Sequence, residues 1–80
     1  MEKRIGNALI IVNSDSPHIK ELNELLSNFS FLIYSRQGVS FKERGINIIV
    51  IVFNGEVNQI NALAGKIGRL QGIKIKIMLI

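Results

Sequence analysis

One segment limits the fold more than any other. Residues 46–53 read Ile-Asn-Ile-Ile-Val-Ile-Val-Phe, and only Asn47 is polar. Successive side chains of a strand point to opposite faces, so this segment is apolar on both. β-branched residues favour strands, and a strand that is apolar on both faces is usually central in its sheet. We therefore predict a central strand over residues 46–53.

The remaining pattern predicts three more strands. Residues 5–13 are β-rich and mostly apolar, and residues 31–36 form a shorter strand before a turn over residues 37–43. Residues 73–79 alternate isoleucines and leucine with Lys74 and Lys76, which is typical of a half-exposed edge strand.

Two helices are predicted between these strands. Apolar residues at helical spacing follow Ser16-Pro17, where Ser16 suits the N-cap and Pro17 the first turn. A second stripe follows the turn at Asn54-Gly55 and ends before Gly72, a typical left-handed C-cap. The order predicts an α+β, ferredoxin-like βαββαβ fold. Its antiparallel sheet has four strands, the 5–13 and 46–53 segments at the centre, and both helices on one face.

The length and composition of the chain indicate one small domain that needs a second subunit for stability. The chain has 80 residues, no cysteine and 48% hydrophobic residues, and we expect a single domain over residues 1–80. A domain this small buries only about 60–65% of the surface of its unfolded chain. Disulfides and thiolate–metal bonds cannot compensate, so an apolar surface shared with a second subunit is expected. We predict a homodimer or tetramer.

The charge pattern, the first residues and the length of the apolar runs limit the expected location and partners of the protein. The chain starts with charged residues, and its longest apolar runs are far shorter than the ~20 residues of a membrane span, so we expect a cytoplasmic protein without membrane association. The net charge is +4, but the ten basic residues are scattered and form no RNA-binding motif. Nucleic acid is therefore an unlikely partner.

The helices can cover only one face of the sheet. Residues 46–53 offer two alternating apolar sets, and one of them must point away from the helices. We predict that the outward set is Ile49, Ile51 and Phe53 and that it forms the oligomer interface.

Arginines and glycines mark one candidate ligand site. Arg36, Gly38, Arg44 and Gly45 flank the predicted turn between the second and third strands. Such residues can bind an anionic group through charge-assisted hydrogen bonds. They can equally be solvated turn residues, or pair with Glu43 and a neighbouring subunit.

Other candidate positions lie in the second predicted helix and at the start of the first. Gly65 and Gly68 each cost about 1 kcal/mol relative to alanine in a helix interior. Close packing against the sheet or a subunit would explain them, and so would room for a ligand. Asp15 and Ser16 most simply serve the helix start, with ligand binding as an alternative. His18 is the one histidine, so we expect no metal site and no cofactor.

Three segments carry a family resemblance: Tyr34–Gly38, Glu43–Ile49 and Leu63–Ile73. The chain resembles the short proteins described as iron-only hydrogenase system regulators, which are grouped with ACT-like domains and the C-terminal domain of the nickel-responsive regulator. The resemblance implies a ferredoxin-like fold, homo-oligomerisation and a regulatory role.

The sequence departs from both parent groups. Many ACT domains carry Asp-x-Pro-Gly before the first helix, and this chain has Asp15-Ser16-Pro17-His18, with His18 in place of the glycine. The cluster of histidine and cysteine ligands of the nickel-responsive regulator has no counterpart, and neither does its DNA-binding segment.

Catalysis is not expected. The sequence has no Ser/His/Asp set, no paired-carboxylate site and no P-loop. Our leading hypothesis is a homo-oligomeric regulatory domain that binds a small anionic or amino-acid effector at a subunit interface. The alternative is a constitutive protein–protein interaction module, with a regulatory protein as partner and no small ligand.

Overall fold

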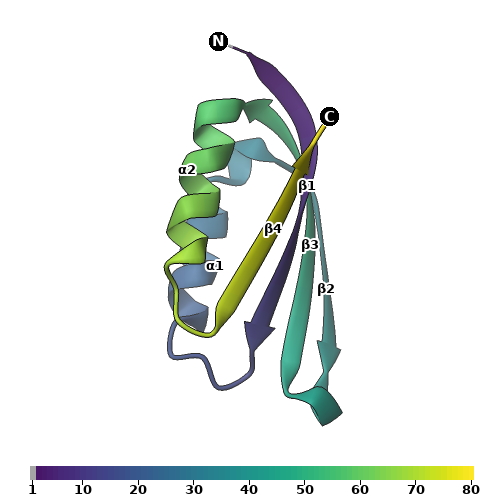
Figure 1. Ribbon diagram of the computed structural model, residues 1–80, viewed down its shortest axis with the longest axis vertical. Coiled ribbons are helices and arrows are strands. Elements are labelled where there is room, and N and C mark those ends of the chain that lie inside the picture. Colours follow the sequence, from purple (N-terminus) through teal and green to yellow (C-terminus); the bar gives the residue numbers. More distant parts are fainter. Residues whose placement is uncertain (1) are drawn as a thin grey trace.

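The computed structural model describes residues 2–80 and has two layers, a sheet and a pair of helices (Figure 1). The element order is the predicted βαββαβ. Its strands are β1 (Lys3–Asn13), β2 (Ile33–Phe41), β3 (Ile46–Glu56) and β4 (Ile73–Leu79), and its helices are α1 (Ile19–Asn28) and α2 (Val57–Gly68). The sheet is antiparallel with the order β2-β3-β1-β4, and both helices lie on one face. The ferredoxin-like fold is confirmed, with β1 and β3 at the centre.

Several predicted boundaries were wrong. α2 ends at Gly68 with a right-handed C-cap at Arg69, so the left-handed Gly72 is not its C-cap and lies in the turn before β4. β2 continues to Phe41, so Gly38 lies within the strand, and the turn to β3 is the short 3-10 helix Lys42–Arg44 followed by Gly45. β3 runs through Asn54-Gly55 and leads directly into α2. α1 begins at Ile19, after His18, so Pro17 is not its first residue. A second short 3-10 helix, Ser30–Leu32, joins α1 to β2.

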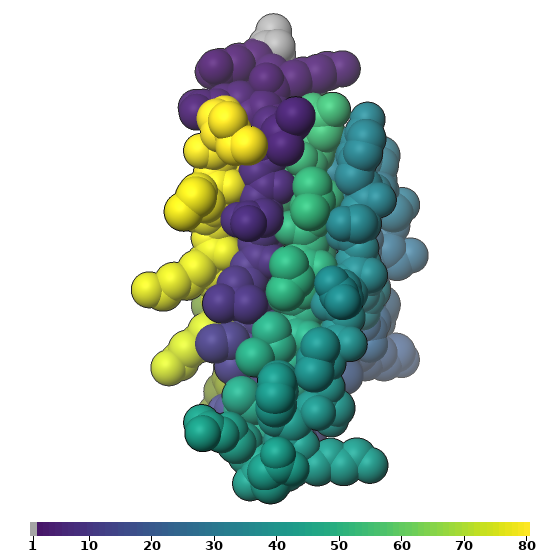
Figure 2. Space-filling view, turned by 90° about the vertical axis from the view of Figure 1, so that its right-hand side faces the viewer, coloured from purple at the N-terminus to yellow at the C-terminus, as the bar shows by residue number. Residues whose placement is uncertain are grey.

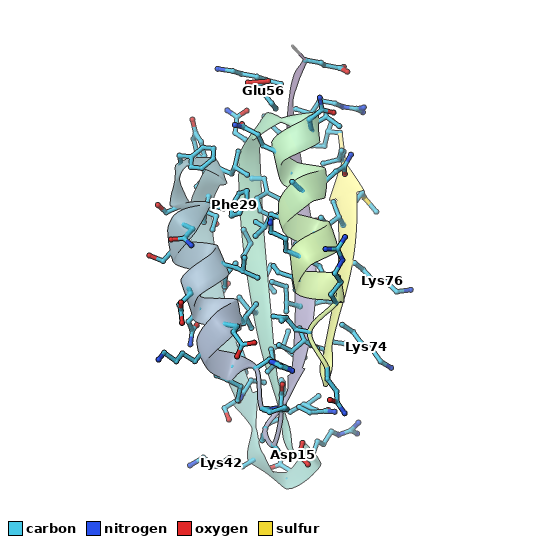
Figure 3. All side chains as sticks on the ribbon, turned by 90° about the vertical axis from the view of Figure 1, so that its left-hand side faces the viewer. Asp15, Phe29, Lys42, Glu56, Lys74 and Lys76 are labelled. Carbon is cyan, nitrogen blue, oxygen red and sulfur yellow. The ribbon has the colours of Figure 1, made fainter. Side chains whose placement is uncertain are left out.

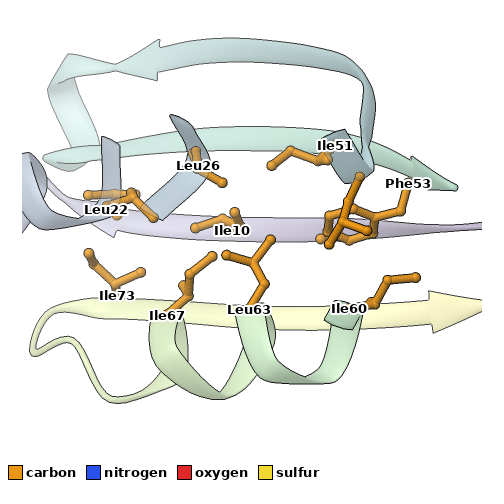
Figure 4. Close-up of a cluster of buried hydrophobic side chains, with 12 residues drawn as sticks. Ile10, Leu22, Leu26, Ile51, Phe53, Ile60, Leu63, Ile67 and Ile73 are labelled. Carbon is orange, nitrogen blue, oxygen red and sulfur yellow. The ribbon is translucent and has the colours of Figure 1, made fainter. Parts of the chain in front are cut away.

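The core lies between the helices and the inner face of the sheet (Figure 4). It takes alternate residues from the central strands and the apolar stripe of each helix. Its fully enclosed large side chains are Ile10, Leu22, Leu26, Leu32, Ile51, Phe53, Ile60, Leu63 and Ile67.

The expected outward set of β3 must be corrected. Ile51 and Phe53 are 0% exposed and pack beneath the helices, and Ile49 packs against the same core. The outward set contains Val50 and Val52, which are 39% and 38% exposed. Both alternating sets are apolar, so the pattern within β3 could not decide which one faces the helices.

Candidate functional site

The outer face of the sheet is uncovered and largely apolar. Figure 2 views it directly, with β4, β1, β3 and β2 side by side. Opposed residues of antiparallel strands share a face, and the register places Leu9 between Val50 and Lys76, and Asn7 between Val52 and Met78. We call this surface the open face. Its apolar members are Ile5, Leu9, Ile11, Val39, Phe41, Ile46, Ile48, Val50, Val52, Met78 and Ile80.

The open face lacks the stacking platform of sheet-type RNA-binding domains. Those domains stack bases on aromatic side chains of the central strands. The outward residues are aliphatic or asparagine over residues 5–13 of β1 and 46–54 of β3, and the charged pair Lys3 and Glu56 lies at the strand ends. Base stacking on the centre of this sheet therefore has no aromatic partner.

β2 is the most solvent-exposed strand of the sheet. All residues from Tyr34 to Phe41 are exposed, on both faces of the sheet. A hydrogen bond ties it to α1, because the Arg36 guanidinium donates to Asn23 Oδ1 over 2.9 Å. Arg36 lies opposite Ile51 in the middle of the strand pair, far along the strand from Arg44 and Gly45. The structure therefore does not bring the four predicted anion-binding residues together.

The loop after β1 is held at one end of the molecule by two other turns. The backbone N–H of Asn13 donates to the Gly72 carbonyl over 2.8 Å, and that of Ser14 donates to the Gly45 carbonyl over 2.9 Å. The Ser16 hydroxyl donates to the Gln71 carbonyl over 2.7 Å. Three chain segments distant in sequence thus meet at this end.

The loop residues have clear local roles. Ser16 Oγ accepts a hydrogen bond from the His18 N–H over 3.1 Å, just before the helix. The predicted N-cap at Ser16 was wrong, because the N-cap of α1 is His18 and makes no side-chain capping bond. Asp15 is exposed beside it, at the same end of the molecule as Lys42 and Lys74 (Figure 3). Of the predicted ligand residues, this end brings together Asp15, Ser16, Arg44 and Gly45.

The helix glycines are not explained by packing within the chain. A Cβ on Gly65 would meet no atom within 4 Å, and one on Gly68 would lie 3.9 Å from a methyl of Ile75, which is ordinary contact. Close packing of α2 on the sheet therefore does not require them. Packing against a second subunit and space for a ligand both remain as proposals.

A cavity opens at the same end of the sheet, on the side of the open face. Its volume is about 380 Å³. It is lined by Ile11, Asn13, Ile46, Gly72, Ile73 and Lys74.

The sequence analysis missed Asn13 and Lys74 as site residues. Lys74 was interpreted only as an edge-strand lysine. The register supplies what was missing, because it sets Asn13 opposite Ile46 and Lys74 opposite Ile11. Figure 3 shows Lys74 and Lys76 projecting from β4 on the side away from α2. Within residues 2–80, no carboxylate oxygen lies within 4 Å of the Lys74 ammonium.

The described part of the chain has no group of three or more His, Cys, Asp or Glu side chains placed to hold a metal ion. His18 Nδ1 instead contacts Glu21 Oε2 at 2.6 Å. None of the described helices has the length and apolar character needed to cross a membrane.

Comparisons with known proteins decide the family. Residues 4–77 match the family model described as "TM1266-like: Iron-only hydrogenase system regulator, putative". The chain belongs to this family. The solved structure of the uncharacterized protein TM1266 from Thermotoga maritima is 34% identical, with a TM-score of 0.94 over 99% of each chain. A search of curated proteins found no match. The family resemblance seen in the sequence is therefore confirmed.

Proposed function

We propose that this TM1266-like chain is a cytoplasmic, non-catalytic regulator of an iron-only hydrogenase system. It associates with copies of itself through the open face and responds to a small effector. The mechanism is linkage: an effector that prefers one assembly shifts the population towards it, and a partner responds to that state. The family description supports the regulatory role.

The observation that carries self-association is the open face. A folded monomer of 9.0 kDa is expected to expose roughly 4,900 Å² of surface. This chain exposes 5324 Å², and its exposed large hydrophobic side chains include Leu9, Val50, Val52 and Met78 of the open face. Large contiguous apolar patches usually mark interaction surfaces.

The open face is also large enough for a dimer. Strands about 4.8 Å apart make a four-stranded sheet roughly 20 Å wide, and a paired length of roughly 30 Å gives about 600 Å² per copy. Two copies packed face to face would bury about 1,200 Å², at the lower end of stable interfaces. A second copy would thus cover the patch without further elements.

Sedimentation equilibrium tests this proposal. Val50→Lys places a charge at the centre of the open face, and we expect it to reduce the mass to that of the monomer. Gln59→Lys is the matched control, because it adds the same charge at an exposed position on α2. Wild type at the monomer mass, or equal masses for both variants and wild type, would contradict assembly through this face.

Effector binding is tested by thermal unfolding with amino acids, organic acids, nucleotides and divalent metals. A ligand at about 100 times its Kd stabilises the native state by ~2.7 kcal/mol. For a domain of this size that raises Tm by roughly 10 °C or more. No saturable shift for any compound would contradict an effector from these classes.

A constitutive interaction module remains the second candidate, because the centre of the open face is aliphatic and offers few polar groups to a small ligand. It predicts an unchanged Tm with every compound and a regulatory protein seated on the open face. In that case Val50→Lys would abolish binding of that protein while wild type alone stays monomeric.

A further inference from the structure

We infer that the cavity at the end of β1 binds the carboxylate of a small aliphatic acid. Lys74 and Asn13 hold the carboxylate, and Ile11 and Ile46 contact the aliphatic body. The inference rests on the proposed effector response and names the site and chemical class of that effector.

The lining decides the class of ligand. The one charged lining residue is Lys74, whose ammonium can pair with an anion, and Asn13 adds an amide that can donate a second hydrogen bond. No carboxylate in the described chain neutralises Lys74, so the site favours an anion. Ile11 and Ile46 supply the outward apolar side chains of the lining, whereas the Ile73 side chain is directed into the core opposite Val12. An inorganic anion would leave these walls without contact, whereas an acid with a branched aliphatic body would bury apolar area against them.

The size of the cavity agrees with this class. Small-molecule sites usually measure about 300–1,000 Å³, and this cavity of about 380 Å³ is at the lower end. A nucleotide would also need a stacking surface or a phosphate cradle, and neither is present among the lining residues. The site therefore suits a compact ligand.

The walls are built by strands already fixed in register. Asn13 pairs with Ile46 across β1 and β3, and Ile11 pairs with Lys74 across β1 and β4. The base is held by the bond from the Asn13 N–H to the Gly72 carbonyl. A preformed site loses little conformational entropy when it binds.

The cavity borders the open face, since Ile11 and Ile46 belong to both. A second copy on the open face would contact the rim of the cavity. Ligand binding and assembly would then share two side chains, which provides the differential contact that linkage requires.

The same geometry selects against free amino acids. The α-ammonium of an amino acid lies next to its carboxylate, so binding of the carboxylate to Lys74 would bring the two ammonium groups close together. Two positive charges placed close together repel each other. The des-amino acid should therefore bind more tightly than the amino acid of the same shape.

NMR titration of the isotope-labelled full chain tests the inference with 4-methylpentanoate as the probe. We expect saturable shifts at the cavity residues, and weaker binding both of leucine and of the uncharged 4-methylpentanamide. Lys74→Gln should weaken the probe by roughly threefold to tenfold, in the range of a partly screened ion pair. Lys76→Gln is the matched control, because Lys76 lies on the same face of β4 outside the cavity, and it should leave Kd unchanged.

Three results would overturn the assignment: no saturable binding of 4-methylpentanoate, equal binding of its amide, or equal losses in the two lysine variants. Tighter binding of leucine would overturn the simple-acid class. The test is separable from that of the proposed function. If another compound shifts Tm but 4-methylpentanoate does not bind, the cavity is not the site and the effector response stands. If a monomeric protein binds the probe, the cavity site stands and self-association is contradicted.

Discussion

Gly72 lies directly against Ser16, and a side chain at this position would force Ser16 to shift by a few tenths of an ångström. The Gly72 backbone is left-handed, with φ +81°, and a Cβ there would lie 3.1 Å from Ser16 Cβ and 3.3 Å from its hydroxyl oxygen. Ser16 is held in place by its bonds to Gln71 and His18. The turn before β4 therefore supports the loop before α1 through a close contact that, together with the positive φ, favours glycine.

The first prediction is that Gly72→Ala lowers the free energy of unfolding by about 1–3 kcal/mol. A left-handed non-glycine residue costs roughly 1–2 kcal/mol, and displacement of Ser16 adds to it. Urea denaturation measures the loss. Gly45→Ala is the control, since φ there is +67° but a Cβ would meet nothing within 4 Å. Equal losses in the two variants would show that the Ser16 contact contributes nothing.

The second prediction contrasts neighbours on β3 that point to opposite faces. Ile51→Ala removes atoms from the closed core and should cost about 2–5 kcal/mol. Val52→Ala acts on the open face and should cost less than about 1 kcal/mol when the protein is monomeric. Chemical denaturation in the Val50→Lys background makes the comparison. Similar losses for both would mean that Val52 is buried even in a single copy.

Ile51 and Val52 also show what could not be predicted from the sequence. The element order followed from the hydrophobic pattern together with β-propensity, turn and cap signals, and the central place of β3 followed from its two apolar faces. Which of those faces points to the helices could not be predicted, because neither alternating set of residues 46–53 contains a charged residue. β1 carried the missing signal: one of its sets includes Asn7 and Asn13, while the other has Ala8 and Ile10 and faces the helices. Pairing β1 with β3 then places Ile51 inward.

The candidate site was harder to predict for a related reason. Gly38 was interpreted as a turn residue, yet the strand continues past it with outward Val39 and Phe41. The cavity needs Asn13, Ile46 and Lys74 from three different strands. Their proximity depends on register, and one sequence without pairing information does not specify register.

The third prediction concerns Arg36. Its bond to Asn23 is exposed, so Arg36→Ala should cost no more than about 1 kcal/mol. A double-mutant cycle with Asn23→Ala measures the coupling. Since Arg36 lies in mid-strand and does not line the cavity, binding of 4-methylpentanoate should be unaffected. A loss of binding in Arg36→Ala with no loss in Lys74→Gln would place the anion site at β2.

The fourth prediction is that Gly65→Ala stabilises the isolated domain. The position is inside α2, and a methyl group added there would meet no atom within 4 Å, so alanine should gain about 0.5–1 kcal/mol from the unfolded chain's lower entropy. Thermal unfolding in the Val50→Lys background measures this gain. Gly68→Ala, at the last residue of α2, is the control and should gain less. If Gly65→Ala stabilises the monomer but lowers the mass of the assembly, α2 packs closely on another copy at this glycine. If the mass is unchanged, subunit packing does not explain Gly65, and space for a ligand is the remaining explanation.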